Sequence, residues 1–199
     1  MADDASVLNI NGRIAARVSS LRSELGLSLE ALAEKCDVSR SMLSLIERGE
    51  SSPTAVVLEK IATGLGVPLA SLFEDSAAPA SPLSRSRDRV PWRDPQSGYV
   101  RTNISPPNYP SPIQIVEVML PAGAHVAYET GARDVNIQQQ VWVQEGKIEL
   151  TLGDQVQPLD AGDCFAMRVN QPIAFRNRTR KPARYIVVLS TSRGPSWRK

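Results

Sequence analysis

Residues 28–49 read Ser28-Leu-Glu-Ala-Leu-Ala-Glu-Lys-Cys-Asp-Val-Ser-Arg-Ser-Met-Leu-Ser-Leu-Ile-Glu-Arg-Gly49 and contain the clearest structural pattern of the N-terminal half. Its apolar residues recur at helical spacing in two short runs, which predicts two amphipathic helices. Between the runs, Asp37 and Val38 leave room only for a turn, and Ser39 is well placed to cap the second helix. A turn this short makes the two helices cross steeply and leaves the polar side of the second one facing outward.

This pattern resembles the lambda-repressor-like helix-turn-helix family, also called XRE, over residues 12–74. The resemblance rests on Ala33 in the first motif helix, Val38 after the turn, and Ile46-Glu-Arg-Gly49 at the end of the second. A fourth helix is expected after Ser52-Pro-Thr54, and a fifth after Gly66-Val-Pro-Leu69. The resemblance therefore implies an all-α domain of five helices that binds DNA.

The chain departs from the family pattern at two positions. Asp37 stands where the turn usually carries glycine, and aspartate tolerates the left-handed backbone that such a turn needs. Leu29 stands where the first motif helix usually opens with a glutamine that contacts phosphate. We therefore expect the left-handed turn to be kept and one backbone contact to be lost.

The second motif helix is expected to present its N-terminal residues to base edges in the major groove. Arginine binds guanine through two hydrogen bonds, serine accepts several bases, and leucine contacts the thymine methyl group. We expect Arg40 and Ser41 to read bases and Arg48 to hold a phosphate, with a solvated charge as the alternative for Arg48. The predicted DNA-contacting residues are Ser39, Arg40, Ser41, Ser44, Leu45, Arg48 and Thr54.

Charge limits the strength of this interaction. Residues 1–75 hold seven Lys/Arg and eleven Asp/Glu, a net charge of −4, whereas residues 76–112 and 113–199 each carry +3. The positive charges that serve DNA must therefore gather locally, and we expect them at Arg13, Arg17, Lys35, Arg40 and Arg48. Few phosphate contacts predict modest non-specific affinity and a shallow salt dependence.

The length of 199 residues suits two domains. We expect a DNA-binding domain over 1–75, a linker over 76–97 and a second domain over 98–199. No run of 18 apolar residues marks a membrane span, the acidic N-terminus is no secretory signal, and a cytoplasmic location is expected. Cys36 and Cys164 lie too far apart to indicate a disulfide framework or a metal clip, and both are expected as buried thiols.

The linker is rich in proline and predicts an extended tether. It also contains a small basic cluster, Arg85, Arg87 and Arg89. This cluster indicates either an arm that reaches DNA or a solvated linker, and we favour the linker.

The C-terminal half consists of short β-branched or alternating runs separated by glycine, proline and aspartate, which predicts a sandwich or barrel. The spacing resembles the cupin family, an all-β double-sheet jelly-roll barrel, over residues 98–192. Val141-Trp-Val-Gln-Glu-Gly146 is similar to the end of the first cupin motif, and the stretch from Leu159 to Asn177 to the second.

Cupin enzymes usually bind a transition metal through three histidines and a glutamate. The resemblance puts Gln139 at the glutamate position and Ile173 at the third histidine position. The first two histidines should fall between Tyr128 and Val135, where none stands, and the single histidine, His125, lies outside these positions. We therefore predict no metal site and no cofactor.

A barrel without a metal keeps a pocket for one ligand. Gln139 is expected to point inward, although a shift of one residue would put Gln138 or Gln140 there instead. Arg133 suits an acidic ligand because a guanidinium pairs with a carboxylate through two hydrogen bonds. The predicted pocket residues are His125, Tyr128, Arg133, Gln139 and Ile173, each with ordinary packing or surface exposure as its alternative.

The two resemblances together imply a transcription regulator of the XRE–cupin type, repressors included, and not an enzyme. Such a protein reads an inverted-repeat operator in double-stranded DNA as a homodimer, and a small-molecule effector shifts the placement of its recognition helices. Three alternatives remain open: a metal-free cupin isomerase or epimerase, a module whose barrel only dimerises or binds a protein partner, and a metal-sensing regulator.

Overall fold

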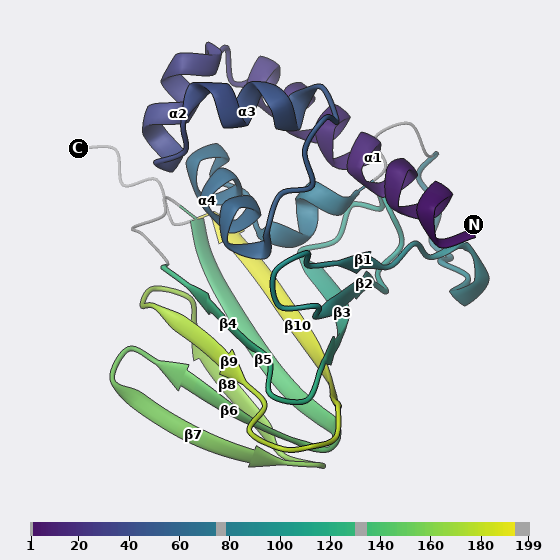
Figure 1. The fold of residues 1–199 in the computed structure, drawn as a ribbon, viewed down its shortest axis with the longest axis vertical. Coiled ribbons are helices and arrows are strands. Elements are labelled where there is room, and N and C mark those ends of the chain that lie inside the picture. The colour runs from purple at the N-terminus through teal and green to yellow at the C-terminus, as the bar shows by residue number, and fades with distance from the viewer. Residues whose placement is uncertain (1, 75–78, 130–134, 194–199) are drawn as a thin grey trace.

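The computed structural model describes residues 2–74, 79–129 and 135–193. A helical half lies at one end of two β-sheets (Figure 1). The helices are α1 (Ala2–Glu24), α2 (Leu29–Cys36), α3 (Arg40–Glu47), α4 (Ala55–Leu65) and the 3-10 helices η1 (Leu69–Phe73) and η2 (Ser86–Asp88). In the described part of the chain, no helix has the length and apolar character needed to cross a membrane.

The strands follow the helical half in sequence and form two sheets. They are β1 (Trp92–Arg93), β2 (Val100–Asn103), β3 (Ile113–Leu120), β4 (His125–Tyr128), β5 (Val135–Glu145), β6 (Lys147–Leu152), β7 (Gln155–Asp160), β8 (Cys164–Arg168), β9 (Ile173–Arg176) and β10 (Ala183–Arg193). One sheet has the order β1-β2-β3-β10-β5-β8 and the other has the order β4-β9-β6-β7.

The turn between α2 and α3 has the conformation that the sequence predicts. Ser39 caps α3, because its Oγ accepts a hydrogen bond from Met42 N at 3.2 Å. Asp37 ends α2 in the left-handed region, with φ 49° and ψ 50°. Lys60 of α4 donates to Asp37 Oδ2 at 2.7 Å and to the Asp37 carbonyl at 3.3 Å, which fastens the turn to its neighbour. The predicted cap and the predicted left-handed turn are both confirmed.

Helix α3 is held from inside and from the side. Leu43 and Ile46 are buried in the helical core, as their spacing predicts. Arg22 of α1 donates to both carboxylate oxygens of Glu47, at 2.6 and 2.8 Å, and to the Leu27 carbonyl at 2.8 Å. This paired geometry fixes the guanidinium and the carboxylate in one plane. The far side of α3 is thereby left to solvent.

The prediction of a fifth α-helix is wrong. The chain forms only a 3-10 helix at Leu69–Phe73, followed by extended backbone at Glu74. All five residues of η1 are buried between the helices and the sheets. Because the backbone is already extended at Glu74, the helical segment is limited to five residues, and segments this short often form a 3-10 helix.

The β half is a sandwich rather than a closed barrel. Among the described strands, no hydrogen-bonded pair joins the six-stranded sheet to the four-stranded one. The long strands β5 and β10 pair along their whole length, with a register shift between Arg184 and Tyr185. The all-β double-sheet expectation is therefore confirmed, whereas closure into a barrel is not seen.

The two cysteines differ in their surroundings. Cys36 is buried, and burial raises the pKa of its thiol. Cys164 is exposed, which corrects the expectation that both thiols are buried. In β8 it pairs with the exposed Trp142 of β5, so the two side chains share the outer face of the six-stranded sheet.

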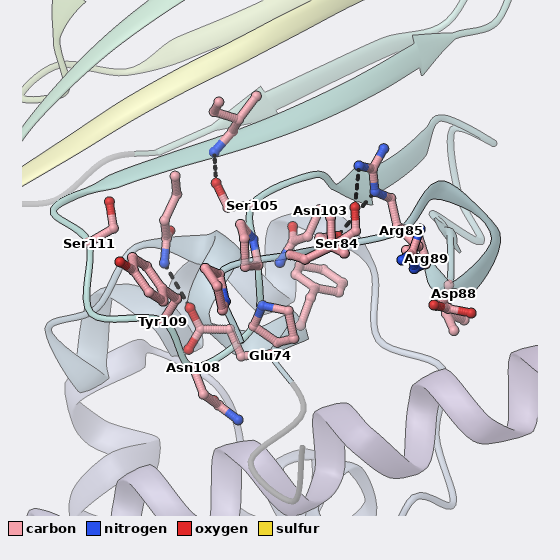
Figure 2. Close-up of a pocket in the computed structure, with 18 of the residues that line it drawn as sticks. Glu74, Ser84, Arg85, Asp88, Arg89, Asn103, Ser105, Asn108, Tyr109 and Ser111 are labelled. Atoms are coloured by element: carbon pink, nitrogen blue, oxygen red, sulfur yellow. Dashed lines mark hydrogen bonds between the residues drawn. The ribbon is translucent and has the colours of Figure 1, made fainter. Parts of the chain in front are cut away.

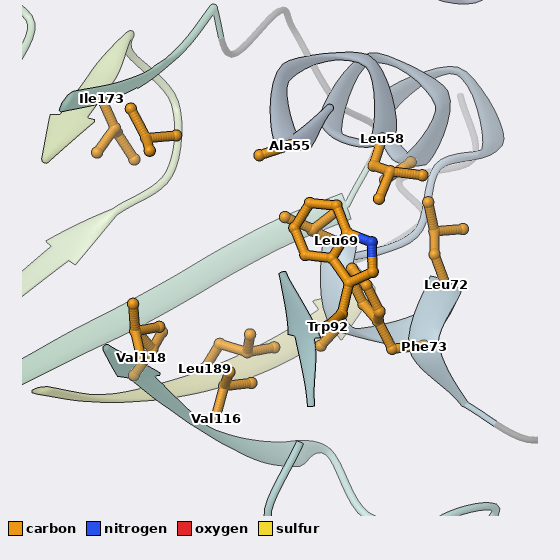
Figure 3. Close-up of a cluster of buried hydrophobic side chains, with 14 of the residues drawn as sticks. Ala55, Leu58, Leu69, Leu72, Phe73, Trp92, Val116, Val118, Ile173 and Leu189 are labelled. Carbon is orange, nitrogen blue, oxygen red and sulfur yellow. The ribbon is translucent and has the colours of Figure 1, made fainter. Parts of the chain in front are cut away.

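The helical half and the sandwich share one hydrophobic core. Trp92 in β1 lies within the range expected as linker, yet β1 pairs with β2, and the indole is only 2% exposed. The centroid of its ring lies 5.3 Å from that of Phe73 in η1 and 5.8 Å from that of Tyr99. Figure 3 shows Trp92 among side chains of both halves, including Leu58. The C-terminal end of the expected linker therefore belongs to the hydrophobic core.

Hydrogen bonds complete this junction. Asp94 is buried and accepts from Ala55 N, the first residue of α4, at 2.9 Å. A carboxylate at a helix N-terminus is favoured by the helix dipole and satisfies a free N–H group. Asn103 of β2 donates to the Ala70 carbonyl of η1 at 3.0 Å. The two halves are therefore fixed to each other at several points.

Candidate DNA-binding surface and ligand cavities

The outward side of α3 lies far from the sandwich, at the end of the molecule that α2 and α3 form in Figure 1. Arg40, Ser41 and Leu45 are exposed, and Ser44 is half-buried. Arg40 and Ser41 form the first turn of the helix, where its free N–H groups also point. Exposed arginine, serine and leucine side chains on a helix are of the kinds that contact base edges in a major groove.

Arg48, which the sequence predicts as a phosphate anchor, is paired within the protein. Its Nε and Nη2 donate to the two carboxylate oxygens of Glu50 at 2.9 Å each, and Nη1 donates to Ser44 Oγ at 2.6 Å. Both ion-pair partners are about half exposed, and Arg48 lowers the pKa of the Glu50 carboxyl through this hydrogen bond. A phosphate must therefore compete with Glu50 for this guanidinium.

Ser39 and Thr54 have structural roles at helix starts. Ser39 caps α3, and Thr54 caps α4 by accepting from Val57 N at 3.4 Å. Ser39 is exposed and Thr54 is half-buried. A role in DNA contact for either residue would come in addition to its role as a helix cap.

Arg13 and Arg17 do not lie on this surface, although the sequence analysis expects them to serve DNA. Both line a cleft between α1 and the sandwich. Arg17 donates to the Ser71 carbonyl at 3.2 Å and to Glu74 at 3.2 Å. Arg13 likewise donates to the Phe73 carbonyl at 3.4 Å, so both side chains face η1 and the cleft rather than the outward side of α3.

A small cavity of about 70 Å³ lies inside the sandwich. Gln139, Tyr128 and Ile173 line it, whereas Gln138 and Gln140 are exposed. Its mouth is covered by the helical half, with Glu59 of α4 and Pro68 and Leu69 among the lining residues. At about 15 Å³ of such volume per water molecule, the cavity has room for only a few heavy atoms.

The other two predicted pocket residues lie elsewhere. His125 is exposed and pairs with Arg176 at the far end of β4. Side chains alternate along a strand, so His125, three residues before Tyr128, points to the opposite face. Arg133 lies outside the described residues.

The cavity is polar at one side but does not suit a transition metal. Tyr128 Oη donates to Tyr99 Oη at 3.2 Å, and burial raises the pKa of the Tyr128 and Tyr185 hydroxyls well above the ordinary value. Tyr128, Gln139 and Ile173 therefore offer the cavity a neutral phenol, an amide and an alkyl group, which are poor ligands for such ions. Within the described residues, no three His, Cys, Asp or Glu side chains gather as a metal site needs.

The cleft between the helical half and the sandwich is much larger, with a volume of about 870 Å³. Figure 2 shows Arg85 and Arg89 of the linker at one end of it, Tyr109 and Ser111 at the other, and Glu74 between them. Sequence reasoning missed this site because its walls come from α1, η1, the linker, β2 and β3, and no local pattern marks such a meeting of distant segments.

Glu74 at the end of η1 joins the two halves across the cleft. It accepts from Arg17 Nη2 at 3.2 Å and from Gln114 Nε2 at 2.8 Å. Burial raises the pKa of the Glu74 carboxyl above its ordinary value of 4.5, although the Arg17 charge opposes this shift. The Glu74 carboxyl thus binds its proton more tightly in the folded protein than in the unfolded chain.

A pH dependence follows from this shift. Because the folded pKa lies above the unfolded one, the contribution of Glu74 to stability is full below pH 4.5 and falls as the pH rises through the folded pKa. The side chain of the Glu74→Gln variant is neutral at every pH, so we expect its free energy of unfolding to lack this decrease. Urea denaturation of both proteins between pH 4 and 7 measures the free energy of unfolding, and Glu30→Gln, at an exposed residue, is the control. Parallel curves for wild type and Glu74→Gln would refute the shift.

Comparison with known proteins supports both halves. Residues 18–72 match the helix-turn-helix family, and residues 119–189 match the cupin domain family. The HTH-type transcriptional regulator SutR of Escherichia coli (strain K12) is 30% identical over 169 residues, which are 85% of this chain and 89% of that protein. PuuR, another HTH-type transcriptional regulator of that strain, is 27% identical and covered to 85%.

A solved structure has a similar fold over most of the chain. The crystal structure of an HTH_3 family transcriptional regulator from Vibrio cholerae has a TM-score of 0.75 and 26% identity. The likeness covers 94% of this chain and 99% of that one. The similarity thus extends across the junction as well as over each half.

Proposed function

Because the chain belongs to the family of XRE-type helix-turn-helix transcriptional regulators with a cupin domain, we propose that it binds an inverted-repeat operator as a homodimer under the control of a small molecule. The observation that carries the DNA-binding part is the free N-terminal turn of α3. Arg40 and Ser41 are exposed there, while Arg22 and Glu47 hold the helix from behind. A helix fixed in this way presents base-reading side chains without first having to order them. A location in the cytoplasm follows from this role.

Binding to DNA as such is tested with a mixed-sequence duplex of about 30 base pairs, by fluorescence anisotropy of the full-length protein over a range of salt concentrations. The exposed cations on this surface are few, so we expect weak binding that falls with salt along a shallow slope. The Arg40→Ala, Arg48→Ala double variant serves as the control. Equal anisotropy for wild type and double variant at low salt would contradict the proposed surface.

The outer face of the six-stranded sheet supports a homodimer through the sandwich. Tyr185, Val187 and Leu189 of β10 line the inner cavity, so Ile186 and Val188 point outward. Ile186 pairs with Trp142 of β5, which is 48% exposed. Apolar residues on neighbouring strands of a flat face are typical of a contact between two copies related by two-fold symmetry.

Replacing Trp142 by glutamate is expected to shift the protein from dimer to monomer, because two carboxylates would be buried near the symmetry axis. Size-exclusion chromatography with light scattering measures the mass at micromolar concentration. Val156→Glu is the matched control, since Val156 is 53% exposed but belongs to β7 in the other sheet. If Trp142→Glu remained a dimer, this face would not be the interface.

The position of the sandwich cavity suggests how an effector acts. Its mouth is covered by α4 and η1 of the DNA-binding half. A ligand of more than a few heavy atoms therefore fits only if these segments move, and α4 is fastened to the α2–α3 turn through Lys60 and Asp37. Ligand binding near Gln139 and Tyr128 would then favour one placement of the recognition helices over another. A metal-free cupin enzyme is less well supported, because the relatives are transcriptional regulators.

A further inference from the structure

The large cleft between the two halves contains polar atoms that the protein leaves without partners. Arg101 Nε, Asn103 Oδ1 and Gln114 Oε1 are buried and have no hydrogen-bond partner within the described residues. A buried polar atom without a partner destabilises the folded protein, because its hydrogen bond to water is lost and not replaced. All three residues line the same cleft, and Arg101 lines the sandwich cavity as well. Three such atoms around one cavity indicate a site that a ligand completes.

The neighbours of the two amides fix which atoms are free. Asn103 Nδ2 donates to the Ala70 carbonyl at 3.0 Å, and Gln114 Nε2 donates to Glu74 Oε1 at 2.8 Å. Exchanging oxygen and nitrogen in either amide would put two acceptors face to face. The free atoms are therefore carbonyl oxygens, and they call for an N–H or O–H donor on the ligand.

Arg101 supplies a buried positive charge. The residue is buried, with 8% of its surface exposed, and its guanidinium carbon lies 5.4 Å from the centroid of the Phe73 ring. No carboxylate of the described residues forms an ion pair with it. A buried guanidinium without a carboxylate partner is costly in the free protein and favours an anion nearby.

The rest of the cleft has the same sign of charge. Arg13, Arg17, Arg85 and Arg89 line it together with Arg101, and Glu74 and Asp88 are the acidic residues among the described lining. Glu74 is itself shared between Arg17 and Gln114. A concave site lined in this way attracts small anions.

We propose that the cleft binds an acidic amino acid, with its carboxylates toward the arginines and its ammonium group toward the carbonyl oxygens of Asn103 and Gln114. The volume of about 870 Å³ lies within the range of small-molecule sites. The ligand would touch α1 of the helical half and β2 and β3 of the sandwich at once. An effect of the ligand on operator binding rests on the proposed function, whereas the binding itself does not.

Titration calorimetry of the full-length protein tests the site with two probes, L-glutamate and glutarate, which share both carboxylates but differ in the ammonium group. We expect L-glutamate to bind and glutarate to bind more weakly. Arg101→Gln should weaken L-glutamate binding about tenfold or more, since a charged hydrogen bond is lost. Absence of heat with L-glutamate and L-aspartate up to millimolar concentration would overturn the proposal.

Arg85 and Arg87 of the linker are both exposed, so replacing either one leaves the core intact. Arg85 lines the cleft, whereas Arg87 does not and pairs with Asp88 at 3.7 Å. We expect Arg85→Ala to weaken L-glutamate binding about three- to fivefold and Arg87→Ala to leave it unchanged. Equal effects of the two, or loss of binding in Gln139→Leu of the sandwich cavity, would place the ligand elsewhere and overturn the proposal. Calorimetric binding without any DNA binding would uphold the cleft site and refute only the proposed function.

Discussion

Replacing Trp92 by alanine is expected to lower the free energy of unfolding by about 3–5 kcal/mol, the range for removing a buried tryptophan side chain. The indole contacts Phe73 of the helical half and Tyr99 of the sandwich, so its removal opens a cavity at the junction. Chemical denaturation measures the loss, and the two halves should then unfold in separate steps rather than together. A single transition shifted by less than about 1 kcal/mol would show that Trp92 does not join the halves.

Trp92→Phe is the control that separates ring packing from hydrogen bonding. The indole Nε1 is buried and has no hydrogen-bond partner within the described residues. Phenylalanine therefore loses part of the packing but no hydrogen bond, and it removes an unsatisfied donor. We expect Trp92→Phe to be clearly less destabilising than Trp92→Ala and to keep one transition.

Replacing Arg40 by alanine is expected to weaken binding to the operator by about 1–3 kcal/mol for each half-site, with little change for unrelated DNA. Arg48→Ala should weaken all sequences about equally and lower the slope of log affinity against log salt by roughly one. Electrophoretic mobility shifts with operator and scrambled duplexes measure both. Equal, sequence-independent losses from the two variants would contradict the division between base reader and phosphate anchor.

The ion pair of Arg48 adds a sharper control. Glu50 holds two of the guanidinium nitrogens at 2.9 Å in the free protein. Glu50→Gln removes the competing charge, so we expect it to raise affinity for all sequences and to steepen the salt dependence. If Glu50→Gln had no effect on affinity while Arg48→Ala reduced it, Glu50 would not compete with phosphate.

Local features of the helical half could be predicted because each depends on residues close in sequence. The cap at Ser39 and the left-handed Asp37 follow from the chemistry of a tight turn, and both occur. The fifth α-helix is not found because Leu69–Phe73 is buried jointly by α1, α4 and the sandwich, a tertiary arrangement that no helical pattern reveals. The Arg22–Glu47 pair, 25 residues apart, is equally invisible in the sequence.

The candidate cavities were predictable in part. Gln139 lines the sandwich cavity as strand alternation requires, while the same alternation turns His125 away. The small volume of that cavity depends on how far α4 and η1 cover it, which is a tertiary property. Trp92 and Asp94 lie in a proline-rich stretch that reads as a tether, yet both are buried at the junction. Composition indicates flexibility only where no partner surface exists.

Selection of bound duplexes from a random pool with the purified full-length protein measures whether the protein reads one specific DNA sequence as a dimer. We expect enrichment of one inverted repeat whose half-sites lie about one helical turn apart, since two recognition helices related by two-fold symmetry would enter successive turns of the major groove. A folded protein that enriches no sequence, or only an unpaired half-site, would contradict this expectation.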